Sequence, residues 1–309
     1  MMNRRAITLL LSLVSGVAAC RQAPEAKAAQ LRAVVTARNQ ELAHRVAIAD
    51  ANPATTPPLA MWIVPPELRE ISGLTLTARG TLLAHDDNVG RVYEIDPRTG
   101  VMLKRFMLSG DPKGDFEAIT TVGTDIYLLE SNGKLYRFKE AADGQEAPYT
   151  RYDTHLGHEC QFESMTYEPD STRLVLVCKK VADKNLRHEL VIYRLTLPVT
   201  DATTPSMITI PMKEVIGANK WPTFRPSDIT IDPLTGNYVL IASKEKALAV
   251  ITPQGEVVRS EPLPPGHDQA EGVTITRDSI LIVSDEATHR PADITLYRWH
   301  SDEPSKTAR

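Results

Sequence analysis

Hydrophobic and polar residues alternate in short runs along most of the chain after residue 60. Alternation over about four to eight residues predicts half-buried β-strands, and almost no helical periodicity interrupts it. Between residues 117 and 154 four such runs follow one another, and turn signals such as Asn132-Gly133 separate them. The four expected strands are Glu117–Thr121, Asp125–Leu129, Lys134–Phe138 and Tyr149–Thr154. Because the same order of runs recurs along the chain, we expect an all-β protein.

A short motif opens each set of runs: Glu or Ser, a short residue, an apolar residue and then Thr. It recurs with a period of about 45 residues, with one longer step before the fourth copy. A β-rich repeat of this length is typical of a β-propeller, in which each repeat forms one four-stranded blade. We therefore expect a five-bladed β-propeller over residues 57–300. The motifs begin at Ser72, Glu117, Glu163, Ser227 and Glu271.

The two ends of the repeat region are complementary. The fifth repeat lacks a fourth strand, and the segment Leu59–Val64 before the first motif has strand-like composition. If this N-terminal strand completes the last blade, the ring closes and no blade edge stays open. The long third step leaves an insertion at Asp201–Phe224, and a degenerate sixth blade there is the alternative to five blades.

The N-terminus has the pattern of an export signal. Arg4 and Arg5 precede an apolar run from Ala6 to Ala19 that is short for a membrane span and suits a signal peptide. The run ends at Cys20 in Val-Ala-Ala-Cys, which is similar to a bacterial lipobox; the alternative is an ordinary signal cleaved near Ala19. We expect residues 1–19 to be a lipoprotein signal, residues 20–56 a tether whose composition suits a helix, and residues 301–309 a flexible tail.

A lipid on Cys20 would anchor the protein to a membrane surface without spanning it. Position 21 is Arg rather than the Asp that usually retains such lipoproteins at the inner membrane. We therefore expect an exported protein in the cell envelope, on the outer membrane facing the periplasm.

Charge and cysteine content narrow the partners and the compartment. The chain has 35 Lys and Arg against 39 Asp and Glu, a net charge of −4, and no basic stripe, which argues against nucleic acid as a partner. Cys160 and Cys178 flank a turn and would lie on adjacent strands. In an oxidising compartment we expect them to form a disulfide, and the alternative is a pair of buried thiols.

The motif residues are the candidates for chemistry. In a propeller the first strand of each blade is innermost, so Glu117, Glu163 and Glu271 would converge at one mouth of the central channel. Ser72, Ser227 and Asp228 would stand beside them as outer ligands or channel-lining groups. Three close carboxylates repel each other, and a hard cation with oxygen ligands offsets that repulsion; Ca²⁺ suits such a flexible site. The alternative is that water, backbone amides or nearby basic residues satisfy the carboxylates.

The turns between second and third strands should surround the same mouth. Loops on a rigid scaffold often carry function, and these turns are polar. The rim candidates for ligand binding are Asp86, Asp87, Lys179 and Asp285. The loop histidines His155, His158 and His267 fit surface positions better than ligand positions.

The five motifs in order give the chain a family resemblance. Glu70–Leu74, Asp115–Ile119, Phe162–Met165, Pro226–Ile229 and Gln269–Val273 resemble the SdiA-regulated family of bacterial propellers, which is similar to NHL-repeat propellers. The resemblance covers roughly residues 60–300. It implies a five-bladed propeller with a bound calcium ion, and it implies no reaction, because the family has no established activity.

Two functions remain open from the sequence. The first is a calcium-binding, lipid-anchored module of the cell envelope that binds a small ligand or an envelope protein. The second is a calcium-dependent hydrolase of lactones or phosphoesters, with a metal at the channel mouth that polarises the substrate. No catalytic motif stands out in the chain, which favours the binding module.

Overall fold

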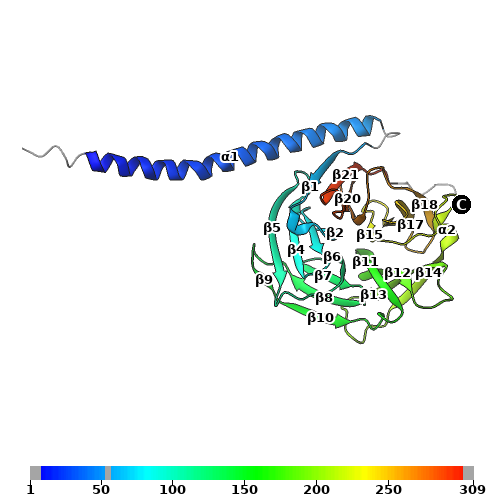
Figure 1. Ribbon diagram of the computed structural model, residues 1–309. Helices are drawn as coiled ribbons and strands as arrows, with labels where there is room; N and C mark the ends of the chain where they lie inside the picture. The colour runs from blue at the N-terminus through cyan, green and yellow to red at the C-terminus, as the bar shows by residue number, and fades with distance from the viewer. Residues whose placement is uncertain (1–7, 53–56, 302–309) are drawn as a thin grey trace, which may run out of the picture.

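The computed structural model describes residues 8–52 and 57–301, with side chains from residue 25 onward. Arg4, Arg5 and most of the tail therefore lie outside the described residues, as does the side chain of Cys20. The propeller prediction is confirmed: five β-sheets stand around a common axis (Figure 1). The first strand of each sheet contacts the first strand of the next, so these five strands form the inner ring.

In blades 1 to 4 four strands follow chain order from the axis outward, each antiparallel to the one before. Blade 1 contains β2 (Ile71–Leu76), β3 (Leu82–Asp86), β4 (Arg91–Asp96) and β5 (Val101–Leu108). Blade 2 contains β6 (Phe116–Val122), β7 (Asp125–Glu130), β8 (Lys134–Lys139) and β10 (Tyr149–Asp153). Blade 3 contains β11 (Cys160–Glu168), β12 (Arg173–Val181), β13 (Glu189–Thr196) and β14 (Ser206–Pro211). Blade 4 contains β15 (Asp228–Ile231), β16 (Tyr238–Ala242), β17 (Ala247–Ile251) and β18 (Val257–Pro262).

Blade 5 combines the two ends of the ring. It contains β19 (Ala270–Ile275), β20 (Ile280–Asp285) and β21 (Asp293–Arg298), and its outer strand is the N-terminal β1 (Ala60–Ile63). β1 pairs antiparallel with β21 in the register Ala60↔Leu296 to Ile63↔Asp293. The expected closure by the N-terminal strand is therefore confirmed.

The insertion does not form a sixth blade. Residues 201–224 supply β14, the outer strand of blade 3, and the short helix α2 (Met212–Ile216). Buried Val215 and Phe224 join the apolar cluster between blades 3 and 4. The extra length is thus used to complete one blade and to cover its junction with the next.

A long helix precedes the propeller. α1 spans Thr8–Ala51 and extends beyond the ring in Figure 1. Its C-terminal part packs on blades 1 and 5, where Leu42 and Ala49 are buried, Arg38 lies over the Trp62 ring, and Arg298 donates to Asp50 at 2.5 Å. Within the described residues, no helix has an apolar stretch long enough to cross a membrane.

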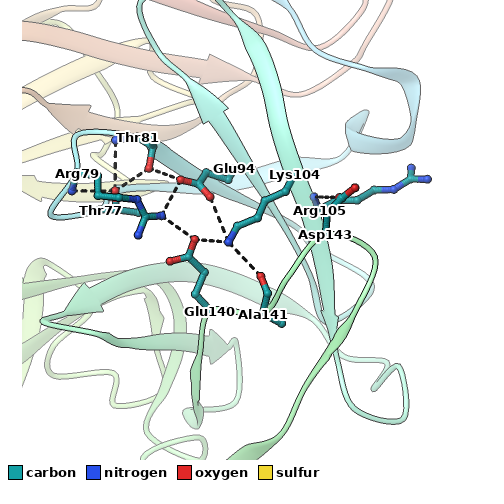
Figure 2. Close-up of polar contacts among 9 residues, drawn as sticks. All are labelled: Thr77, Arg79, Thr81, Glu94, Lys104, Arg105, Glu140, Ala141 and Asp143. Atoms are coloured by element: carbon teal, nitrogen blue, oxygen red, sulfur yellow. Dashed lines mark hydrogen bonds and ion pairs between the residues drawn. The ribbon is translucent and has the colours of Figure 1, made fainter. Parts of the chain in front are cut away.

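A polar network ties the loop after β8 to blade 1 (Figure 2). Buried Glu94 accepts from Arg79 at 2.8 Å and from Thr81 at 2.5 Å, and its other oxygen faces Lys104 at 3.5 Å. Glu140 pairs with the same Arg79, at 2.6 Å, and with Lys104. Beyond this loop β9 (Glu146–Ala147) adds a parallel fifth strand to blade 1. The network therefore holds the loop after β8, which belongs to blade 2, against the outer edge of blade 1.

We expect the Glu140 ion pairs to make the free energy of unfolding depend on pH in the acid range. Partial burial raises the pKa of Glu140, but the hydrogen bonds from Arg79 and Lys104 outweigh it and lower the pKa from 4.5 to about 2. A depressed folded-state pKa stabilises the fold above pH 4.5, and this contribution is lost as the pH falls from 4.5 towards 2. Glu140→Gln should therefore lower the free energy of unfolding by about 1 kcal/mol at pH 7.

Urea unfolding between pH 7 and pH 2.5 measures this difference. The deficit of Glu140→Gln should shrink across the acid range, and Glu256→Gln, which removes an exposed carboxylate outside the network, should show no deficit. A deficit of Glu140→Gln that stays constant with pH would assign its effect to packing instead.

Candidate site at the channel mouth

Irregular strand pairing aims the motif glutamates out of their sheets. The ladder steps from Phe116↔Glu130 to Ala118↔Leu129, so Glu117 has no partner opposite it. Register shifts also bracket Glu163 in β11, Glu271 in β19 and Ser72 in β2. A β-bulge turns its extra residue away from the regular alternation of the strand. Four of the five motif residues are thus bulge positions at the entrance to an innermost strand.

The three glutamates line one cavity of about 200 Å³ at the channel mouth. Among the described residues, seven acidic side chains and a single basic one, Lys179, line the cavity. The acids that sequence reasoning did not select are Glu70, Asp115 and Glu286, and the other four are Asp87, Glu117, Glu163 and Glu271. Glu70 and Asp115 stand two residues before a motif residue, on the same side of an extended chain, and this spacing is the signal that could have found them.

Burial and mutual repulsion favour protonated carboxyls in this cavity. Burial, with the charges of Glu163 and Asp115, raises the pKa of Glu117 to about 9. Burial and Glu163 raise the pKa of Glu271 to about 7, and burial with Glu70 does the same for Asp87. The pKa of Glu163 is raised by burial even though Lys179 opposes that shift. A positive charge in the cavity would therefore be strongly stabilised.

Lys179 supplies only part of that positive charge. Its ammonium group donates to Oε1 of Glu163. Burial disfavours the charged lysine, but the hydrogen bond and the neighbouring glutamates outweigh burial and raise its pKa. Glu163 is 4 % exposed, and its second oxygen, Oε2, has no hydrogen-bond partner among the described residues. A buried carboxylate oxygen without a partner is costly, so a cation or a hydrogen-bond donor beside this atom would stabilise the site.

The donor set fits a hard cation. Seven carboxylates, the Ser72 hydroxyl and the Gln269 amide line the cavity, and such oxygens are the ligands that Ca²⁺ prefers. Among the described residues, however, the acidic trio whose oxygens lie within 4.8 Å of one another is Glu70, Asp86 and Asp87 at the edge of the cavity. The three motif glutamates surround the cavity more loosely. An ion could therefore use the glutamates, the edge trio, or both through water.

The other motif residues hold the ring together. Ser72 lines the cavity and donates to the Glu117 carbonyl at 3.4 Å, and Ser227 donates to the Ala270 carbonyl at 2.7 Å, so each links two blades. Asp228 is 2 % exposed and accepts from the backbone amides of Val273 at 2.7 Å and Ile229 at 2.8 Å. Ser227 and Asp228 are therefore buried between blades and do not line the cavity.

Two expectations are wrong: Asp285 is not a rim residue, and His267 is not a surface residue. Asp285 is buried, with Oδ1 accepting from the amides of Asp268 at 2.8 Å and Gln269 at 3.0 Å, and Oδ2 pairing with His267. His267 is 3 % exposed rather than on the surface, and its other ring nitrogen lies 2.9 Å from the Tyr297 hydroxyl. A buried chain of contacts from Asp285 through His267 to Tyr297 therefore lies where we expected a free carboxylate. Asp87 and Lys179 do face the mouth, as expected.

The expected disulfide is present. Cys160 and Cys178 are joined with an S–S distance of 2.03 Å and a Cα–Cα distance of 5.6 Å. The bond connects β11 and β12 next to Glu163 and Lys179, so it holds the two strands that carry this ion pair. A disulfide fits an oxidising, non-cytoplasmic compartment.

Fold and site together define a β-propeller with an acidic cavity at one mouth of its channel. The chain is similar in fold to two solved propeller-class structures at low sequence identity. A PQQ-bound aldose sugar dehydrogenase from Streptomyces coelicolor has a TM-score of 0.53 and 11 % identity, with 79 % of this chain and 98 % of that chain covered. Glutaminyl cyclase from Myxococcus xanthus has a TM-score of 0.55 and 10 % identity, with 80 % and 97 % covered. These likenesses concern the fold alone.

No protein-family model matches the chain, and no curated protein matches it. The function must therefore be argued from the site.

Proposed function

We propose that this protein is a calcium-binding β-propeller of the cell envelope that uses the loops around its channel mouth to bind a ligand or a partner protein. The unpartnered, buried Oε2 of Glu163 carries the proposal, because a cation would stabilise a carboxylate oxygen in this acidic cavity. Glu117 and Glu271 share the cavity and supply further oxygens. The order of the five motifs supports kinship with the SdiA-regulated propellers, and the sequence around Cys20 supports a lipid anchor at the outer membrane.

Thermal unfolding tests the cation site. We expect the mature chain, with Cys20→Ser to prevent lipidation, to melt several degrees higher in Ca²⁺ than in EDTA. A ligand at 100 times its Kd adds about 2.7 kcal/mol to the native state, and each kcal/mol raises the midpoint by about 2–4 °C for a domain of this size. The protein used should keep the part of α1 that contains Leu42 and Ala49, because these residues pack on the propeller.

Mg²⁺ serves as the control ion, since it demands tighter octahedral geometry than a loose ring of carboxylates offers. An equal midpoint in EDTA and in Ca²⁺, after removal of any tightly held ion, would refute the proposal.

One observation keeps the hydrolase as a second candidate. Asp87, with a pKa raised to about 7 by burial and by Glu70, stands at the edge of the same cavity as Lys179. A carboxyl group with a pKa near neutrality can act as a general acid or base. Calcium-dependent hydrolysis of a lactone or a phosphoester that is lost in Asp87→Asn, with calcium binding retained, would favour the enzyme over the binding module.

A further inference from the structure

A second hollow opens beside the acidic cavity, between blades 3 and 4. It has a volume of about 260 Å³, and Lys179 lines both hollows. Its other charged residues are Lys180, Arg187, Arg225 and a single acid, Glu189. Charges of opposite sign therefore separate at the channel mouth: the acidic cavity lies on one side of Lys179 and the basic hollow on the other.

The basic side chains of this hollow are not neutralised by the protein. Among the residues that the structure describes, neither Lys180 nor Arg225 makes a side-chain ion pair, and Arg187 only donates to the ring of His188, at 3.0 Å. Arg79 on blade 1 is a contrast, because it bridges two carboxylates. Uncompensated positive charges gathered in one hollow favour an anion there.

Local structure explains how the charges come together. Lys179 and Lys180 end β12, and Arg187 lies in the loop to β13, which an Asx turn at Asp183 shapes through a 2.8 Å bond to the Asn185 amide. Arg225 stands two residues before the motif residue Ser227, the place that Glu70 and Asp115 take in blades 1 and 2. Blade 4 thus replaces an acid at this ring position by a base.

The floor of the hollow is apolar. Leu190 and Phe224 are both 1 % exposed, and Phe224 packs against Trp221 with ring centroids 6.3 Å apart. Guanidinium and ammonium groups above an apolar floor suit a ligand with a doubly charged oxyanion and a small carbon body. A phosphate monoester has this form, since it carries a charge of about −2 near pH 7 and accepts bidentate hydrogen bonds from arginine. The volume, about 260 Å³, lies just below that of typical ligand pockets, which are about 300–1,000 Å³, so only a small ligand fits.

We propose that this hollow binds the phosphate group of a small organic phosphate monoester, with Lys180, Arg187 and Arg225 as its charged contacts. Lys179 couples this anion site to the acidic cavity, a part that rests on the proposed cation site. A cation in the cavity competes with the Lys179 ammonium for Glu163 and so releases it towards the anion. Cation and anion then bind with positive cooperativity.

Isothermal titration with phenyl phosphate in EDTA tests the anion site without any cation. We expect saturable binding that weakens as salt is added, and a loss of at least about tenfold in affinity in the double variant Lys180→Gln/Arg187→Gln. The matched control is Lys244→Gln, which removes one exposed positive charge from the turn between β16 and β17, a charge with no ion pair to any residue that the structure describes. It should keep the wild-type affinity. Absence of saturable binding, or equal binding by the double variant, would overturn the proposal.

Repeating the titration in Ca²⁺ tests the coupling separately. We expect the affinity for phenyl phosphate to rise several-fold in the wild type and to stay unchanged in Lys179→Gln. If Ca²⁺ raises the melting temperature but not the phosphate affinity, the coupling through Lys179 is wrong. If Ca²⁺ does not bind at all, the proposed cation site fails, and the titration in EDTA still decides the anion site.

Discussion

Glu117→Gln should abolish the calcium-dependent rise in melting temperature while leaving the protein in EDTA at least as stable as the wild type. Without a cation, burial and the charges of Glu163 and Asp115 raise the pKa of Glu117 to about 9, so this carboxyl carries a proton at pH 7. Glutamine then replaces a neutral group of the same shape. With a cation the comparison reverses, because the amide cannot supply the negative charge that a calcium site requires.

The expected loss in calcium affinity is about 100-fold or more, since even indirect changes around a metal cost about 10–100-fold. Calorimetric titration of Ca²⁺ and melting curves in EDTA measure the two halves of the result. Glu256→Gln, which removes a carboxylate remote from the cavity, is the matched control and should change neither. If Glu117→Gln keeps the full calcium shift, the ion sits elsewhere, and Asp87→Asn then tests the edge trio of Glu70, Asp86 and Asp87.

Glu163→Gln separates cation binding from the existing ion pair. This variant should also lose calcium affinity, but in EDTA it should be less stable than the wild type, because Lys179 loses its carboxylate partner. If Glu163→Gln destabilises the protein in EDTA and Glu117→Gln does not, only the charge of Glu163 is neutralised by the protein itself, through Lys179. Equal effects would contradict this assignment.

Asp228→Ala should cost more stability than any other substitution considered. Asp228 is fully enclosed; burial raises its pKa well above the usual value, and the amides of Val273, Ile229 and Leu74 act against that rise. Alanine leaves these buried N–H groups without an acceptor, at about 1–3 kcal/mol for each group. We expect a loss of about 3–5 kcal/mol, or roughly 10 °C in melting temperature.

The matched comparison is Ser227→Ala. It removes one neutral hydrogen bond to the Ala270 carbonyl and should cost about 1 kcal/mol. For each variant the loss of stability should be the same in EDTA as in Ca²⁺, since neither residue lines the cavity. A calcium-dependent deficit in Asp228→Ala would return this carboxylate to the metal site.

The propeller itself could be predicted from the sequence because its signals are local. Strand alternation and turns such as Asn132-Gly133 define each blade, and the repeated motif counts the blades. The unpaired fifth repeat indicated the closing role of Leu59–Val64, since an open blade edge is unfavourable. The insertion at 201–224 gave no such local signal, because β14 acquires its role only by pairing with β13.

The candidate site was only partly predictable. Convergence of Glu117, Glu163 and Glu271 follows from the repeat, whereas their projection from the sheets depends on bulges in the pairing with second strands. The sequence suggests a rim position for Asp285 and a surface position for His267, and the burial of both depends on Tyr297 of the next strand. The basic hollow likewise joins Lys180 to Arg225 across two blades. Side chains brought together by tertiary pairing leave little trace in a single sequence.

The pairing of β1 with β21 also sets a time order for folding. The first strand of the propeller to leave the ribosome finds its partner only after residues 293–298 have been made, so the ring cannot close on an incomplete chain. Contacts between residues so distant in sequence form slowly. Under the proposed export, this delay would keep the strands unpaired until synthesis ends. A chain that ends before β21 would leave β1 without its partner strand, and we expect such a chain to be sensitive to proteases.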